Sequence, residues 1–395
     1  MALHPTRPGV SPTHALTADE IATRISATRS IMRERGLATL CLVSPENIYY
    51  LTGLNHLGYF AFTLLVLPLE GEPRLVTRAM ERTTVAAQVP ECVHVTFADD
   101  EDPADAAVRA LRQVVVGRGR VGMEQASMYL PVAVWERMRE RLADLDWSDQ
   151  SDLVAGVRAV KSPAEIERIR CAAEISDRAI QAGMTAARAG VTEREVAAAV
   201  YRELVLAGSE APGSAPLIRS REILLQEHVT WGDHLLGHGD ALFMELSASV
   251  ARYHAPLSRM VYLGRAPRGT ERAAEIAAIG LDAVLTALRP GAVSGEVYAA
   301  WQPVIDNGLG HARYRRHHCG YAVGIGCPPS WVGGSAVTGL RQGGDLVIRE
   351  GMVFHVLSWI LDQEPADYVL SDTVLVTATG GDLLTNTSRD PTVIP

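Results

Sequence analysis

Cysteine is scarce in this sequence, and no two cysteines stand at the spacing of a metal-binding pair. The 395 residues include five cysteines, which are Cys41, Cys92, Cys171, Cys319 and Cys327. An odd count without a CxxC pair argues against a disulfide framework and against a zinc knot. Free thiols are typical of a reducing compartment, so the sequence predicts a cytoplasmic protein.

The sequence also lacks basic runs, long apolar runs and an apolar signal core at its start. The formal net charge is -9, which argues against nucleic acid or an anionic membrane as a partner. No apolar run reaches the roughly 20 residues that a membrane span requires. Residues 1–17 are rich in proline and polar side chains, which predicts a flexible arm and not a secretory leader.

The overall composition is that of an ordinary globular protein, with 47% hydrophobic and 21% charged residues. A chain of this length usually divides into two domains. Residues 18–150 alternate short apolar strands with helices, which predicts an α/β domain whose sheet is covered by helices. Residues 151–395 combine long amphipathic helices with strands that pair mostly as hairpins, which predicts an α+β domain.

One predicted hairpin, residues 239–264, sets ionisable side chains among apolar ones. GDALFMEL predicts a strand, VARYH a turn, and PLSRMVYLG the returning strand. The hairpin carries Glu245, Tyr253, His254 and Arg259. A carboxylate inside an apolar strand costs free energy unless it is paired or used in chemistry. Two roles are therefore open for Glu245, a strand-end charge neutralised by Arg259 or a functional group.

Several motifs follow one another in a set order along the chain. They are VRAVKSPAEIERIR, GDALFMEL, RYHAPLSR, HHCGYAVGIG, EGMVFHV and SDTVLVT. This order resembles the pita-bread fold of methionine aminopeptidase, prolidase, aminopeptidase P and creatinase, and YYLTGL is similar to the creatinase-type N-terminal domain. The resemblance implies a pita-bread catalytic domain of the α+β class over residues 151–395, preceded by a creatinase-like α/β domain over residues 18–150.

The resemblance also implies where metallopeptidases of this fold hold two metal ions, through two Asp, one His and two Glu side chains. Matched motif to motif, these positions fall on Glu245, Pro256, Tyr321, Leu357 and Ser371. Proline and leucine side chains cannot bind a metal ion, and one carboxylate cannot hold a divalent pair. We therefore expect no metal and no other cofactor, and metal-dependent peptide cleavage is disfavoured.

Two relatives of this fold, creatinase and ectoine hydrolase, work without a metal. Creatinase uses a histidine that falls on His228, but its two glutamates fall on Ser258 and Leu357. HVTWGD, RYHAPLSR, GYAVGIG with PPSW, and GMVFH fit the ectoine hydrolase pattern better. That resemblance implies a metal-independent hydrolase of a C–N bond in a small cyclic amidine.

Two alternatives to this activity stay open. The unusual SAS and SWILDQEP segments favour a relative that acts on another small amino-acid, guanidino or amidine metabolite, in a biosynthetic pathway. The other alternative is a binding relative that has kept the fold and lost the chemistry.

A first group of side chains is predicted to carry the chemistry, namely His228, Glu245, His254, Tyr321 and His355. His228 is expected to shuttle protons, since its unperturbed pKa is about 6.5. Glu245 is expected to act as a base or as a nucleophile. For His254 and His355 a hydrogen-bonded core histidine is an equal alternative, and for Tyr321 a structural tyrosine.

A second group is predicted to contact the substrate, namely Tyr253, Trp231, Arg259, His318, Trp331, His56 and Tyr59. Trp231 and Trp331 are candidates for stacking on a planar amidinium, with core packing as the alternative. The expected partner is a small zwitterionic or amidine substrate. The resemblance further implies a homodimer in which the N-terminal domain of one subunit covers the partner's site, with His56 and Tyr59 as contacts.

Overall fold

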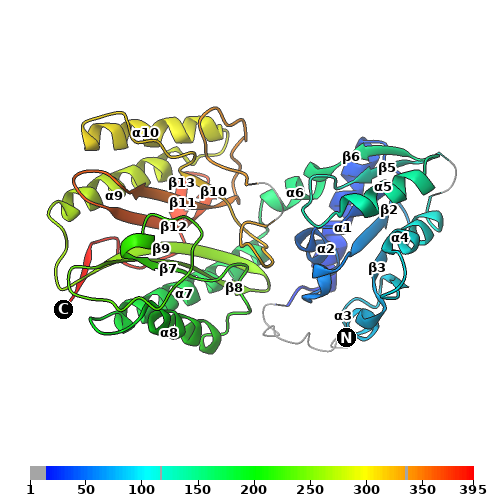
Figure 1. Ribbon diagram of the computed structural model, residues 1–395. Helices are drawn as coiled ribbons and strands as arrows, with labels where there is room; N and C mark the ends of the chain where they lie inside the picture. Colours follow the sequence, from blue (N-terminus) through cyan, green and yellow to red (C-terminus); the bar gives the residue numbers. More distant parts are fainter. Residues whose placement is uncertain (1–14, 116–117, 334–336) are drawn as a thin grey trace. The chain divides into compact units, whose positions relative to one another are not determined.

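The computed structural model describes residues 15–115, 118–333 and 337–395. The described chain divides into two compact units, which are coloured from blue to green and from green to red in Figure 1. Unit 1 ends at Ala159, and unit 2 begins at Val160. The predicted boundary after residue 150 lies one helix earlier. Of the arm predicted over residues 1–17, residues 1–14 lie outside the described residues. Thr17 is the N-cap residue of the first helix.

Unit 1 is built on a six-stranded mixed sheet with the strand order β4-β3-β2-β1-β5-β6. Its strands are β1 (Thr39–Leu42), β2 (Leu64–Pro68), β3 (Arg74–Arg78), β4 (Val93–Phe97), β5 (Arg120–Met123) and β6 (Asp146–Asp149). Its helices are α1 (Ala18–Glu34), α2 (Pro45–Thr52), α3 (Arg82–Gln88), α4 (Pro103–Arg112), α5 (Val132–Arg141) and α6 (Ser151–Ala159). The α/β class predicted for this part of the chain agrees with this order.

Both faces of the unit 1 sheet are covered. Cys41 and Val66 share one hydrophobic core with Ala107 of α4. Leu40 and Leu67, whose side chains point to the opposite face, are also fully buried. A sheet that is buried on both faces has nearly continuous apolar strands, and for this reason the first strand was recognisable in the sequence.

Unit 2 contains an eight-stranded, almost wholly antiparallel sheet with the main order β10-β11-β12-β9-β8-β7, in which β13 pairs with β12 and β14 with β9. Its strands are β7 (Leu217–Ser220), β8 (Ala241–Val250), β9 (Tyr253–Leu263), β10 (Gly320–Ala322), β11 (Val353–Ile360), β12 (Tyr368–Thr377), β13 (Gly380–Leu383) and β14 (Thr392–Ile394). Strand β7 ends at Ser220, because the chain turns into a 3-10 helix at Arg221–Ile223.

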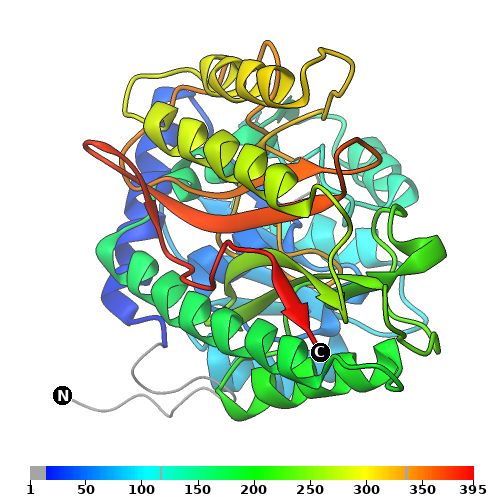
Figure 2. The ribbon, with the colours of Figure 1, turned by 90° about the vertical axis from the view of Figure 1, so that its left-hand side faces the viewer.

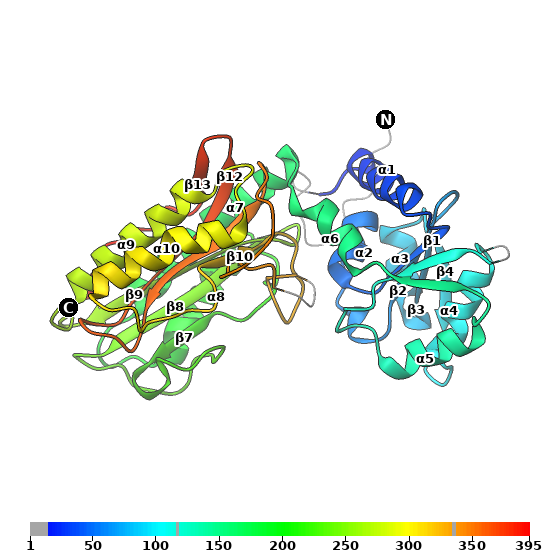
Figure 3. The ribbon, with the colours of Figure 1, turned by 90° about the horizontal axis from the view of Figure 1, so that it is seen from above.

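Four helices accompany this sheet, namely α7 (Pro163–Ala186), α8 (Glu193–Leu206), α9 (Thr270–Ala287) and α10 (Ser294–Leu309). Helix α7 begins at a capping box made by Ser162 and Glu165, with Pro163 in its first turn. Figure 2 shows the green pair α7 and α8 beside the light-green hairpin, and the yellow pair α9 and α10 beside the orange strands. Figure 3 shows α9 and α10 running along each other over their half of the sheet. None of the helices in the described ranges is long and apolar enough to cross a membrane.

The two helix pairs pack on one face of the unit 2 sheet. On β8, Met244 faces α7, since a Cβ at Gly183 would lie 2.9 Å from its sulfur. On β11, the hydroxyl of Ser358 accepts a hydrogen bond of 3.2 Å from the indole of Trp301 in α10. Successive strand residues point to opposite faces, so Glu245 points away from the helices. We call this second face the inner face.

The central hairpin turns more tightly than the sequence predicted. We expected VARYH to form the turn, but β8 continues to Val250 and β9 begins at Tyr253. The turn consists of Ala251 and Arg252 alone, with φ values of 49° and 64°. A two-residue turn with two positive φ values matches the twist of the flanking strands, and asparagine and glycine usually mark it. Because the sequence has neither residue there, the turn was predicted in the right place but its two-residue length was not.

Candidate active site

Four neighbouring strands bring one row of side chains together across the inner face. Glu245 of β8 lies opposite Ser258 of β9, and Ser258 lies opposite Ser371 of β12. Ser371 in turn lies opposite Leu357 of β11. Neighbouring strands are about 4.8 Å apart, so this row is about 15 Å wide. It has a carboxylate at one end, two hydroxyls in the middle and an apolar side chain at the other end.

A second row runs beside the first on the same face. Tyr321 of β10 lies opposite His355 of β11, which lies opposite Thr373 of β12. The Thr373 hydroxyl donates a hydrogen bond of 2.7 Å to the backbone oxygen of Pro256 in β9. Side chains two residues apart on a strand share a face, so His355 and Tyr321 lie on the side of the sheet that carries Glu245.

One chain of hydrogen bonds links the two rows. The indole nitrogen of Trp331 lies 3.0 Å from the phenol oxygen of Tyr321, which lies 2.8 Å from Nδ1 of His355. Nε2 of His355 lies 2.7 Å from the Ser371 hydroxyl, which lies 2.6 Å from that of Ser258. An indole N–H can only donate. With Trp331 donating to the phenol oxygen, the Tyr321 proton is available for Nδ1, and His355 donates from Nε2 to Ser371.

Burial keeps this chain of hydrogen bonds uncharged. It lowers the pKa of His355 to about 3, so the imidazole is neutral around pH 7. It also raises the pKa of Tyr321 well above its usual value, and the nearby Glu245 charge acts in the same direction. The network therefore orients neutral donors and acceptors on the inner face and does not hold an ion.

Glu245 is the titratable group of the first row. Its side chain is almost completely buried, and one carboxylate oxygen lies 3.9 Å from Nδ1 of His355. Burial raises the pKa of Glu245 to about 8, Glu227 raises it further, and the positive charges of Arg219 and Arg316 oppose this shift. The carboxyl group thus titrates close to neutral pH, which suits a group that must both accept and release a proton.

The structure also brings together the five positions that match metal ligands in metallopeptidases of this fold. Glu245, Ser371 and Leu357 belong to the first row, and Pro256 and Tyr321 to the second. A divalent pair needs several anionic oxygen or imidazole ligands, and this set offers one carboxylate. Within residues 15–115, 118–333 and 337–395, no group of three or more His, Cys, Asp or Glu side chains is placed to hold a metal ion.

His254, which we predicted to be catalytic, has a structural role in the fold. Its Nε2 accepts a hydrogen bond of 2.8 Å from the backbone N–H of Gly213, so Nδ1 carries the proton and donates to the backbone oxygen of Arg252 at 2.9 Å. Burial lowers its pKa to about 4. With both nitrogens engaged by the backbone, this imidazole cannot exchange protons with a substrate.

Arg259 and Tyr253, two of the predicted substrate contacts, lie on the face of the sheet that packs on the helices. The Arg259 guanidinium forms a fully buried ion pair of 2.7 Å with Asp372. The Tyr253 hydroxyl donates to Glu165 of α7 at 2.8 Å. Both residues are odd-numbered on β9, whereas Ser258 on the inner face is even-numbered, so neither side chain can reach a substrate beside Glu245. Arg259 therefore does not neutralise Glu245 either.

His228 and Trp231 lie on the loop between β7 and β8. His228 is exposed, with a φ of 54°. Burial lowers the pKa of His317, and the nearby His228 acts in the same direction. His228 therefore lies near the segment that leads into β10. It is not part of the hydrogen-bond chain of the inner face. Trp231 packs against Tyr201 of α8, with ring centroids 5.6 Å apart. The predicted stacking of Trp231 on the substrate stays a prediction.

His318 and Trp331 both lie against Tyr321. The His318 ring makes an edge contact with Tyr321 at 5.4 Å between centroids, and burial lowers its pKa to about 4. Trp331 is buried and donates to the phenol as described above. Both residues therefore adjoin the site, Trp331 as a group that positions Tyr321.

His56 and Tyr59 belong to unit 1 and form a local cluster there. His56 lies 3.4 Å from the carboxylate of Glu81, and its ring lies 6.1 Å from that of Tyr59. Tyr59 in turn makes an edge contact with Tyr129 at 5.7 Å. Their predicted contact with the site of a partner subunit stays a prediction.

Two arginines near Glu245 were not predicted. Arg219 on β7 lies opposite Phe243 of β8, and Arg316 precedes β10. Both influence the pKa of Glu245. An arginine beside the apolar residues of LIRSREILL was the available signal for Arg219. Arg316 lies in a run of charged residues, which offered no such contrast.

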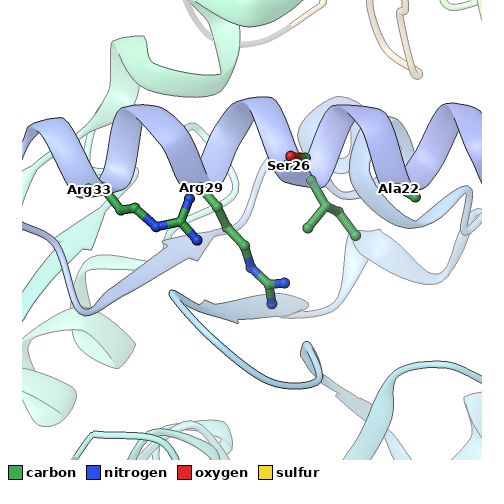
Figure 4. Close-up of a pocket in the computed structure, with 5 residues that line it drawn as sticks. Ala22, Ser26, Arg29 and Arg33 are labelled. Carbon is green, nitrogen blue, oxygen red and sulfur yellow. The ribbon is translucent and has the colours of Figure 1, made fainter.

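A separate cavity of about 330 Å³ lies along α1 in unit 1 and is drawn in Figure 4. It is lined by Ala22, Ile25, Ser26, Arg29 and Arg33. Arg33 pairs with Glu70 at 2.8 Å, and Arg29 donates to the backbone oxygen of Pro68 at 3.1 Å. Its cationic side chains are thus engaged by unit 1 itself, and the cavity contains none of the groups described above.

Models of two protein families match this chain. The model of metallopeptidase family M24 matches residues 167–378, and that of the creatinase/prolidase N-terminal domain matches residues 24–160. The two matches follow one another along the chain without overlap.

Individual proteins match over nearly the full length. An ectoine hydrolase from Halomonas elongata is 27% identical over 94% of this chain and 97% of its own. A Xaa-Pro dipeptidase from Pyrococcus furiosus is 26% identical over 93% and 99%. The crystal structure of a prolidase from Thermococcus sibiricus superimposes with a TM-score of 0.83 at 21% identity, over 95% of this chain and 99% of that one. The predicted fold, a creatinase-type N-terminal domain followed by a pita-bread domain, is confirmed.

Proposed function

The chain belongs to metallopeptidase family M24 and has a creatinase/prolidase N-terminal domain. We propose that this hydrolase cleaves a C–N bond of a small cyclic amidine without a metal ion. The observation that carries this proposal is the donor set of the inner face. Of the five side chains at the matched ligand positions, Glu245 supplies the one carboxylate, and Pro256 and Leu357 supply no ligand atom. We derive no step through a metal ion.

Glu245 supplies the chemistry that an amidine needs. Its ionised carboxylate either removes a proton from water, so that the oxygen adds to the amidinium carbon, or adds to that carbon itself. In both cases one C–N bond of the ring breaks, the departing nitrogen takes up a proton, and one water is consumed overall. A cationic amidinium beside Glu245 also favours the ionised carboxylate, because opposite charges attract more strongly in a buried site.

The neutral chain through His355 and Tyr321 suits this reaction as a positioning device. It fixes uncharged donors and acceptors beside the carboxylate, at 3.9 Å between Glu245 and His355, and such groups stabilise developing charge without first having to reorganise. The proton for the leaving nitrogen is assigned to His228, because an imidazole can both accept and donate a proton. Its place on an exposed loop next to His317 requires that the loop approach the bound substrate.

The relatives point to two substrate classes. The ectoine hydrolase of Halomonas elongata is named for a cyclic amidine, and the dipeptidase of Pyrococcus furiosus for Xaa-Pro peptides. Both cover nearly the whole chain at similar identity, so their names alone do not choose between a cyclic amidine and a peptide. The donor set of the inner face favours the amidine.

The test is mass spectrometry of EDTA-treated protein incubated with ectoine. We expect a product heavier than ectoine by one water, formed at the same rate before and after EDTA treatment, and no product with E245Q. A matched incubation with an Xaa-Pro dipeptide and Mn²⁺ tests the competing activity. Turnover of the dipeptide that depends on Mn²⁺ would overturn the proposal, as would equal activity of E245Q on ectoine.

A further inference from the structure

The buried Arg219 and the largely buried Arg316 stack on a pair of aromatic rings next to Glu245. The guanidinium carbon of Arg219 lies 4.0 Å from the centre of the Phe243 ring, and that of Arg316 lies 4.6 Å from the centre of the Trp359 ring. The two rings meet edge to face at 5.4 Å. We call these four side chains the arginine–aromatic cluster. They come from β7, β8, β11 and the segment before β10.

The cluster contains buried donors without a hydrogen-bond acceptor. Among the described residues, Nε of Arg219, Nε of Arg316 and the indole nitrogen of Trp359 have no hydrogen-bond partner. Arg219 is 1% exposed and Trp359 is 2% exposed, so these donors lie in the protein interior. A buried donor left unpaired costs about 1–3 kcal/mol. Unpaired donors also occur elsewhere in the chain, but here three of them belong to one contacting cluster.

The charge of the cluster selects the kind of acceptor. Arginine remains protonated, and its planar fork matches a carboxylate in a bidentate geometry. Stacking on Phe243 and Trp359 covers the faces of the two guanidinium groups. One terminal nitrogen of Arg219 donates to the backbone oxygen of Gln226, so the Nε side of each guanidinium is left to bind a ligand. Edge-on donors of two neighbouring arginines therefore suit a small anion with at least two acceptor oxygens.

Glu227 already shows this kind of contact. One of its carboxylate oxygens lies 3.2 Å from a terminal nitrogen of Arg316. The Glu227 side chain is 46% exposed, whereas that of Arg316 is 13% exposed. A single contact from an exposed side chain is worth little, so another carboxylate can take its place on Arg316.

The cluster adjoins the reacting group. Phe243 stands two residues before Glu245 on β8, and Trp359 stands two residues after Leu357 on β11, so both rings belong to the inner face. Two residues along a strand span about 7 Å. A carboxylate on the cluster would thus be held about one small ring away from the Glu245 carboxylate.

From these contacts we infer that the arginine–aromatic cluster binds the carboxylate of the substrate, with Arg219 and Arg316 as its ligands and Glu227 as the group it displaces. The inference rests on the proposed function for the reacting end of the substrate. It narrows the substrate class to small amino-acid derivatives that carry one carboxylate close to the C–N bond that is cleaved.

A binding experiment tests the cluster without relying on turnover. The probe is sodium acetate, titrated into ¹⁵N-labelled full-length protein at constant ionic strength, with sodium chloride and sodium phosphate as competing anions. The readout is the indole N–H resonance of Trp359, assigned by its loss in W359F. We expect a saturable shift of this resonance with acetate. The dissociation constant for acetate should be about 10–100-fold higher in R219M and R316M, because each variant loses one to two charge-assisted hydrogen bonds.

Three further variants complete this titration. R272M removes an exposed arginine paired with Glu275 and should leave the acetate affinity unchanged. E227Q should tighten acetate binding, because it removes the competing carboxylate. R219K keeps the charge but loses the fork, so it separates a geometric role from a purely electrostatic one. A Trp359 resonance that does not move, that moves equally with chloride, or that prefers phosphate would overturn the inference.

A kinetic experiment separates this inference from the proposed function. If ectoine is hydrolysed, its analogue without the carboxylate, 2-methyl-1,4,5,6-tetrahydropyrimidine, should have a kcat/KM about 10–100-fold lower, and R219M should abolish this preference. Equal kcat/KM for the two compounds in the wild-type enzyme would overturn the carboxylate site. Failure to hydrolyse ectoine would count against the proposed substrate, while the acetate titration would still decide the fate of the cluster.

Discussion

Tyr321 and His355 face each other across β10 and β11, with the phenol oxygen 2.8 Å from Nδ1 of the imidazole. The same Nδ1 atom lies 3.9 Å from a carboxylate oxygen of Glu245. The pair therefore connects a neutral network, anchored by Trp331, with the carboxylate to which we assign the chemistry.

Removing the Tyr321 hydroxyl should affect catalysis more than binding. Y321F deprives Nδ1 of His355 of its hydrogen-bond donor, so we expect kcat to fall about 10–100-fold, in line with the loss of one preorganised donor, while KM changes little. Steady-state kinetics with ectoine measure both constants. W331F, which removes the donor to Tyr321 but leaves the Tyr321–His355 bond, should have a smaller effect. A larger loss in W331F than in Y321F would contradict this role.

The pH dependence of activity should follow the buried carboxyl group. If Glu245 must be ionised, kcat/KM rises with pH and levels off above a pKa of about 8. E227Q removes a charge that raises this pKa and should move the rise to lower pH. R219M removes a charge that lowers the pKa and should move the rise to higher pH. R272M is the matched control and should not move it; a profile that falls between pH 6 and 9 would count against Glu245 as base or nucleophile.

The same carboxyl group should make folding stability depend on pH. Its pKa is raised from about 4.5 in the unfolded chain to about 8 in the folded protein, so the folded state binds the proton more tightly. Stability is then full below about pH 4.5 and decreases as the pH rises towards 8. E245Q should therefore be more stable than the wild type at pH 8, by on the order of 1–3 kcal/mol. Urea denaturation at pH 5 and pH 8 measures the two differences, and a difference that does not grow with pH would refute this shift.

Arg259 should contribute to stability and not to substrate binding. R259M removes the nearer of the two arginines that pair with buried Asp372 and leaves Arg389 at 3.5 Å, so we expect a loss of up to about 3–5 kcal/mol. Thermal unfolding measures this loss. KM, determined at low temperature on folded protein, should stay at the wild-type value. Loss of the exposed Arg272–Glu275 pair in R272M should change stability by less than about 1 kcal/mol. A stable R259M with a raised KM would restore Arg259 as a substrate contact.

The two-domain organisation and the fold class could be predicted from the sequence, because strand and helix periodicity and the order of motifs are local properties. Glu245 was recognisable for a similar reason, since a carboxylate in an apolar strand is conspicuous without any knowledge of its neighbours. The missing donors at Pro256 and Leu357 followed from residue type at matched motif positions.

The tertiary structure alone decided which of these side chains meet. Tyr253 and Arg259 lie on the helix-covered face of β9, and a turn of just Ala251 and Arg252 sets this alternation. Gly213, which lies 41 residues earlier in the chain, engages Nε2 of His254. The arginine–aromatic cluster likewise joins Arg219 to Arg316 through strands paired over long sequence separations. Strand register and long-range packing determine such contacts, and a local sequence pattern records neither of them.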